Sequence, residues 1–151
     1  MPVMVFQGVI INQQPRIPVL FEVPAYNVDG IVHFVIDTGS RFSALSEKDA
    51  TILGIDCASL PYARTEAIGF GGPFRTKMIN RLVNLVFHST CGREYRIRYS
   101  SGFKVTFVPP ETPREEREKM LRYTPSVLGM DVLTKFELRL DRRSVQLILK
   151  E

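Results

Sequence analysis

Short apolar runs separated by turn residues set the strongest limit on how this chain can fold. The runs occupy positions 3–11, 17–24, 31–36, 82–87, 95–99, 103–108, 138–141 and 145–149, and most carry β-branched or aromatic residues. Runs of this length and composition favour β-strands, and the Asn, Asp, Gly and Pro residues between them favour tight turns. The sequence therefore predicts a mainly β protein with meander-like hairpins.

Three segments have the signals of short helices instead, namely 47–53, 112–123 and 130–136. Ser46 stands where an N-cap residue is preferred before the first segment, and Gly54 stands where a helix commonly ends. Thr112 and Glu115 have the spacing of a capping box at the start of the second segment. We therefore expect an all-β fold class, mainly β with two or three short helices.

Length and hydrophobicity indicate one globular unit. With 151 residues, 44% of them hydrophobic, the chain can bury one well-packed core but is short for two independent lobes. We expect residues 1–151 to form a single domain. The N-terminus lacks a basic segment followed by an apolar stretch and a cleavage site, and no apolar run is long enough to cross a bilayer. We therefore expect a cytoplasmic protein with no membrane partner.

The net charge of +4 requires a nucleic-acid partner to be considered. The basic residues are scattered over several segments, and none of these segments has a nucleic-acid-binding motif. We interpret them as solvated faces, so that a basic nucleic-acid-binding β protein is the weakest alternative and no nucleic-acid partner is expected. Cys57 and Cys91 belong to no CxxC pair and have no histidine at ligand spacing, so we expect structural thiols and no metal.

One acidic residue at the end of an apolar strand is the strongest candidate for chemistry. The strand 31–36 leads into Asp37, which is followed by Thr38, Gly39 and Ser40. A carboxylate in this position is partly desolvated, and the glycine lets the backbone turn tightly and bring N–H groups close to the carboxylate. Such a group is suited to acid–base catalysis. The same four residue types are also common in ordinary turns, and the motif alone does not decide between the two interpretations.

Further segments follow this motif in an order that resembles the retropepsin-like family of aspartic proteases over about residues 17–149. They are the strand 42–45 with the helix after it, the glycine-bearing segment 67–72, and the segment 127–131 that opens a helix. The most specific of these features are the DTGS motif and the later segment of two apolar residues and glycine. The resemblance implies a retropepsin-like acid-protease barrel with one lobe per chain.

The resemblance also implies roles for individual residues. The catalytic residues would be Asp37, Thr38 and Gly39. Substrate would be bound by the catalytic loop and by a flap hairpin, through Ser40, Arg41, Ile68, Gly69, Phe70, Gly71 and Gly72. The segment behind the catalytic loop would support it through Val127, Leu128, Gly129 and Asp131.

The chemistry of this family requires two carboxyl groups that share one proton, and the chain has a single DTG motif. A two-fold homodimer is the simplest way to bring a second Asp37 opposite the first. The expected activity is an aspartic endopeptidase that activates water between the two carboxyl groups, cleaves peptide or polypeptide substrates and needs no cofactor. The alternative is a catalytically inactive module that keeps the fold and only binds peptides or regulates a partner.

The sequence departs from retroviral members at two positions. These members carry an acidic residue two positions after the DTG glycine and an arginine directly after the later glycine, whereas Arg41 and Met130 occupy these positions here. We expect Arg41 to pair with Asp131 instead, so that a reversed ion pair ties the catalytic loop to the C-terminal helix.

Overall fold

The computed structural model describes residues 3–63, 67–69 and 72–150, and for 67–69 and 72–74 it describes the backbone only. Its strands are β1 (Val3–Ile11), β2 (Gln14–Val23), β3 (Val28–Ile36), β4 (Ala44–Ser46), β5 (Ala67–Gly69), β6 (Gly72–Ile79), β7 (Val83–His88), β8 (Glu94–Tyr99), β9 (Phe103–Phe107), β10 (Val127–Leu128), β11 (Glu137–Leu140) and β12 (Ser144–Lys150). Its α-helices are α1 (Glu47–Leu53), α2 (Arg114–Tyr123) and α3 (Met130–Leu133), and short 3₁₀ turns cover Pro24–Tyr26 and Cys57–Ser59. The predicted mainly β fold class with short helices is confirmed.

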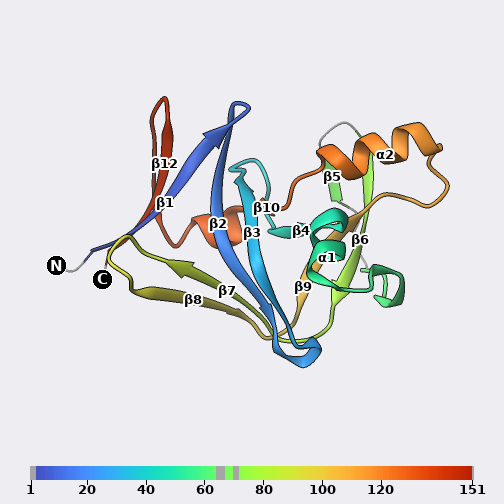
Figure 1. Ribbon diagram of the computed structural model, residues 1–151, viewed down its shortest axis with the longest axis horizontal. Coiled ribbons are helices and arrows are strands. Elements are labelled where there is room, and N and C mark those ends of the chain that lie inside the picture. The colour runs from blue at the N-terminus through green and yellow to red at the C-terminus, as the bar shows by residue number, and fades with distance from the viewer. Residues whose placement is uncertain (1–2, 64–66, 70–71, 151) are drawn as a thin grey trace.

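The described strands form one mixed sheet in the order β11-β12-β1-β2-β3-β10-β4-β9-β6-β5, with β7 paired to β2 and β8 paired to β7. Most neighbours are antiparallel, but β10 runs parallel to β3, and β4 runs parallel to β9. Figure 1 shows the two chain ends close together, in agreement with the pairing of β1 and β12, while α1 and α2 lie on the opposite side of the molecule. The centre of the sheet, where β3, β10 and β4 meet, lies between these two parts.

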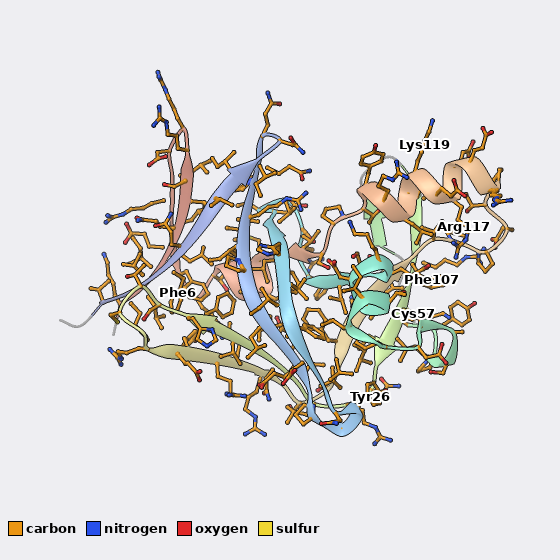
Figure 2. All side chains as sticks on the ribbon, viewed as in Figure 1. Phe6, Tyr26, Cys57, Phe107, Arg117 and Lys119 are labelled. Atoms are coloured by element: carbon orange, nitrogen blue, oxygen red, sulfur yellow. The ribbon has the colours of Figure 1, made fainter. Side chains whose placement is uncertain are left out.

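Alternating side chains of the central strands build the core. Phe6, Phe21, Phe34, Phe87 and Phe103 are among the largest fully buried side chains. Phe6 packs edge-on against Phe87 with 5.8 Å between ring centroids, and Phe21 packs edge-on against Phe103 at 5.3 Å. Figure 2 shows Phe6 on the side of the chain termini, well away from α1 and α2. Buried aromatic pairs of this kind hold the central strands in place.

The helix signals in the sequence give mixed results. The prediction for 47–53 is confirmed: the Ser46 side chain accepts from the Asp49 N–H, and Gly54 ends α1 with a left-handed backbone at φ 89°. The capping box predicted at Thr112 is wrong, because α2 begins at Arg114 with Pro113 as its N-cap and no side-chain cap bond. The Thr112 N–H donates instead to Pro109 O at 3.0 Å, in a turn before the helix.

The helix predicted over 130–136 is confirmed in its start directly after Gly129, but α3 ends at Leu133. The final hairpin is confirmed as β11 and β12. Within the described residues, no helix is long and apolar enough to cross a membrane.

Candidate active site

The end of β3 places Asp37 at the centre of the sheet. Its N–H donates to Leu128 O at 3.0 Å, so the residue continues the parallel pairing of β3 with β10. Its side chain is partly buried, as the sequence predicts for a carboxylate that follows an apolar strand. The position of the carboxylate is therefore fixed from the backbone side by two neighbouring strands.

The turn after Asp37 binds one of its carboxylate oxygens. The Gly39 N–H donates to Asp37 Oδ1 at 2.9 Å, and the Ser40 N–H donates to Asp37 O at 3.2 Å. A Cβ atom on Gly39 would lie 3.2 Å from the same Oδ1, so a side chain there would crowd the carboxylate. Among the described residues, no group donates a hydrogen bond to Asp37 Oδ2. One oxygen is thus held, and the other has no donor among the described residues.

Thr38 and Gly39 form the exposed tip of this turn, and Ser40 is partly exposed. The Ser40 hydroxyl donates to Phe42 O at 2.7 Å. We refer to residues 37–42 as the catalytic loop. The loop is thus closed by its own short-range hydrogen bonds and presents Asp37 and Thr38 at its start.

The segment predicted to lie behind the catalytic loop is there in the structure. Val127 pairs with both Val35 of β3 and Ala44 of β4, and Leu128 pairs with Ile36. A Cβ atom on Gly129 would lie 2.6 Å from Phe42 O and 2.7 Å from Ser40 O. The residue must be glycine for the start of α3 to approach the backbone of the loop this closely.

Asp131 joins the same support through its carboxylate. Its Oδ1 accepts from the Ser43 hydroxyl at 2.7 Å, and its Oδ2 accepts from the Tyr99 hydroxyl at 2.9 Å. The Ser43 hydroxyl oxygen also accepts from the Gly129 N–H at 3.0 Å. The side chains of Ser43, Tyr99 and Asp131 therefore connect β8, the end of the catalytic loop and α3.

The predicted ion pair between Arg41 and Asp131 is wrong. Within the described part of the chain, the Asp131 carboxylate has the two hydroxyl donors just given and no ion-pair partner. The main chain of Arg41 hydrogen-bonds to α3, since the Asp131 N–H donates to Arg41 O at 3.2 Å. Its guanidinium lies 5.9 Å from the centroid of the Phe42 ring. Two neutral hydroxyl groups have taken the place of the expected cation.

The segment predicted as a flap forms a hairpin of β5 and β6, with Ile68 opposite Pro73 and Gly69 opposite Gly72. The predicted tip residues Phe70 and Gly71 lie outside the described residues, and for Ile68, Gly69 and Gly72 only the backbone is described. Strand β6 pairs with β9, and β9 pairs with β4, which follows the catalytic loop. The hairpin and the loop therefore belong to one continuous set of strands.

Sequence reasoning missed Ser43, Tyr99 and Ser126 as supporting residues. Ser126 is fully buried; its hydroxyl accepts from the Ser46 N–H at 2.8 Å and donates to Asp49 Oδ2 at 2.6 Å. Its carbonyl accepts from the Val35 N–H at 2.8 Å. No motif in the sequence identifies these three, because their hydrogen-bond partners lie far away in the sequence. Among the described residues, no group of three or more His, Cys, Asp or Glu side chains is placed to hold a metal ion.

Comparisons with known proteins agree with this architecture. No protein-family model matches the chain, and no curated protein matches its sequence. A retropepsin-like aspartic protease from Rickettsia conorii has a similar structure, with a TM-score of 0.53 and 21% identity, over 98% of this chain and 93% of that one. The EIAV protease in complex with the inhibitor HBY-793 gives a TM-score of 0.45 and 18% identity, over 82% and 88% of the two chains. The chain has a retropepsin-like fold, as its sequence predicts.

Proposed function

We propose that two copies of this chain form an aspartic endopeptidase in which Asp37 and its symmetry mate make up the catalytic dyad. The fold is that of retropepsin-like aspartic proteases, which supports a protease as the kind of protein. The observation that carries the proposal is the environment of Asp37. One carboxylate oxygen is fixed by the Gly39 N–H at 2.9 Å, and the other has no donor among the described residues.

The proposed reaction needs one carboxyl group as base and the other as acid. Two carboxyl groups this close share a single proton, because two adjacent negative charges repel each other. The ionised group takes a proton from a water molecule held between the pair, and the water attacks the peptide carbonyl. The protonated group donates to the carbonyl oxygen. The group that took the water proton then passes it to the amide nitrogen, the other group takes a hydroxyl proton from the tetrahedral intermediate, and the C–N bond breaks to give a carboxylic acid and an amine. Each chain has one such group, so the dimer is a requirement of the chemistry.

Other residues of the loop hold the dyad and the substrate in this proposal. The Gly39 N–H holds one oxygen of each carboxylate through its hydrogen bond to Oδ1. Thr38, at the exposed tip of the turn, faces the second copy and stiffens the pair. Ser40 and the β5–β6 hairpin bind the peptide from opposite sides, in the manner of an added strand. The flap residues Phe70 and Gly71 that the sequence predicts belong to this part of the proposal.

The substitution Asp37→Asn tests the catalytic role. The amide keeps the shape and oxygen of the carboxylate but cannot act as the base, so we expect peptide cleavage to fall by at least about a thousandfold. Sedimentation should give the same dimer for the variant and the parent. Peptide cleavage by Asp37→Asn at the parent rate would refute the assignment.

A second measurement separates an enzyme from a module that only binds peptides. A peptide in which a hydroxyethylene group replaces the scissile amide mimics the tetrahedral intermediate, and a protease binds such a mimic far more tightly than the substrate. We expect this preference for the mimic in the parent protein. Equal affinity for the mimic and the parent peptide, together with no cleavage, would support the non-catalytic alternative.

A further inference from the structure

An exposed aromatic ring with two cations near it lies at the end of the catalytic loop. Phe42 is 52% exposed. The Lys104 Nζ atom lies 3.8 Å from the centroid of its ring, and the Arg41 guanidinium carbon lies 5.9 Å from the same centroid. Both contacts are cation–π interactions, which hold each cation near the ring without neutralising its charge.

Neither cation forms an ion pair with a carboxylate of the described residues. The ion pairs found there include those of Arg75, Arg96, Arg114, Arg117, Arg139 and Lys150, as well as His88. Arg41 and Lys104 take part in none of these pairs. Two positive charges beside one ring repel each other, and they create a local positive potential that attracts an anion.

Arg41 belongs to the catalytic loop, and the strand pairing places Lys104 between β4, which follows this loop, and the end of β6 away from the hairpin turn. Lys104 lies opposite Ala44 of β4 and opposite Met78 of β6. Its neighbours Phe103 and Val105 are buried in the core, so by the alternation of a strand Lys104 lies on the other face. A peptide held between the loop and the hairpin, as in the proposed function, would cross this face.

We propose that Arg41 and Lys104 select substrates with an acidic side chain within a few residues of the scissile bond. The carboxylate binds the two cations, and the methylene groups of the acidic residue lie against the Phe42 ring. The same arrangement disfavours a basic side chain at that position, because it would add a third positive charge. This inference rests on the proposed function for the path of the peptide, and its test does not depend on cleavage.

Binding to the Asp37→Asn protein provides the test. We would use fluorescently labelled short peptides that are identical except that one Glu replaces Gln, with the Glu moved along the peptide. We expect one or two positions at which the Glu peptide binds about fivefold more tightly than the Gln peptide, the size of a partly exposed ion-pair contact. The difference should shrink as the salt concentration rises, because exposed charges are screened.

Variants of the two cations identify the source of the preference. Lys104→Met, and more completely the double variant Arg41→Gln with Lys104→Met, should remove the preference for Glu, whereas Lys104→Arg should keep it. Lys119→Met is the matched control, since Lys119 is exposed and extends from α2, away from the strands of the site (Figure 2). The control should retain the full preference.

The outcomes separate the two proposals. Equal binding of the Glu and Gln peptides at every position, or a preference that survives in the double variant, would overturn the selection of acidic substrates even if the parent protein cleaves peptides. A clear Glu preference that depends on Arg41 and Lys104 supports it, even if the parent protein cleaves nothing and the proposed enzyme activity fails.

Discussion

The Tyr99 hydroxyl donates a hydrogen bond to Asp131 Oδ2 over 2.9 Å and thereby links the end of β8 to the first turn of α3. Both side chains are partly buried. Burial raises the pKa of Tyr99 well above its ordinary value, and the negative charge of Asp131 and the hydrogen bond between the two groups raise it further. The neutral phenol is the form that this contact requires.

The substitution Tyr99→Phe should lower the free energy of unfolding by about 1–2 kcal/mol, because it leaves a partly buried carboxylate oxygen without its donor. Urea unfolding at a fixed protein concentration measures the change. Tyr95→Phe on the same strand is the matched control: its ring packs 5.7 Å from Phe136, and its hydroxyl has no hydrogen bond to any described residue. Equal losses in the two variants would contradict the role of the Tyr99 hydroxyl.

The same contact predicts how stability depends on pH. Because the pKa of Tyr99 is raised in the folded state, the unfolded chain releases this proton first, near the ordinary tyrosine value of about 10. The contribution of Tyr99 is fully present below that pH and is lost as the pH rises above it. We expect the free energy of unfolding to fall more steeply above about pH 10 in the parent than in Tyr99→Phe. Identical slopes in the two proteins would rule this out.

The small side chain of Ser43 should contribute strongly to the free energy of unfolding. Ser43 is only 3% exposed, and its hydroxyl group accepts from the Gly129 N–H and donates to Asp131 Oδ1. Ser43→Ala leaves the buried Gly129 N–H without a partner, and it leaves Asp131 Oδ1 with the Val132 N–H, at 3.0 Å, as its remaining donor. We therefore expect a loss of about 2 kcal/mol in the free energy of unfolding. Ser40→Ala, which removes one exposed hydrogen bond, should cost about 0.5 kcal/mol in the same urea experiment. A smaller loss for Ser43→Ala than for Ser40→Ala would contradict this account.

Gly129 tests whether the close approach of α3 to the catalytic loop is required. Its φ of −99° suits any residue, so the cost of Gly129→Ala comes from the contacts of 2.6–2.7 Å with the backbone of Phe42 and Ser40. We expect a loss of about 3 kcal/mol, measured by urea unfolding. Gly92→Ala is the control, because Gly92 has a positive φ of 84° and no described atom within 4 Å of an added Cβ. This control should cost about 1 kcal/mol from backbone strain alone.

These residues also show which parts of the structure could be predicted from the sequence. The strand ending at Asp37, the α1 cap at Ser46 and the start of α3 at Gly129 were predictable, because each depends on residues that are neighbours in the chain. The prediction from neighbouring residues failed where two acceptors, Pro109 O and the Glu115 side chain, competed for the Thr112 N–H. The Thr112 N–H donates to Pro109 O in a turn, and α2 begins only at Arg114. The predicted capping box therefore does not form.

The Asp131 carboxylate is the clearest case of what the sequence could not reveal. Its position after Gly129 indicated a link to the catalytic loop, and the link exists, but the predicted partner Arg41 was wrong. The actual hydroxyl donors are Ser43, directly after the catalytic loop, and Tyr99, whose contact depends on the path of β8 past α3. A single sequence carries no signal for that contact, because Tyr99 and Asp131 are 32 positions apart and share no motif.

Mixed dimers test the requirement for two Asp37 carboxyl groups most directly. If each active unit needs one from each chain, a dimer of one parent chain and one Asp37→Asn chain is inactive. At a fixed amount of parent protein, an equal amount of freely exchanging Asp37→Asn should lower peptide cleavage to about half, and a threefold excess to about a quarter. The control is Asp29→Asn, an exposed change near the start of β3, which should add activity. Cleavage that stays constant as Asp37→Asn is added, after exchange has been verified with tagged chains, would show that a single chain is enough and would remove the basis for a shared dyad.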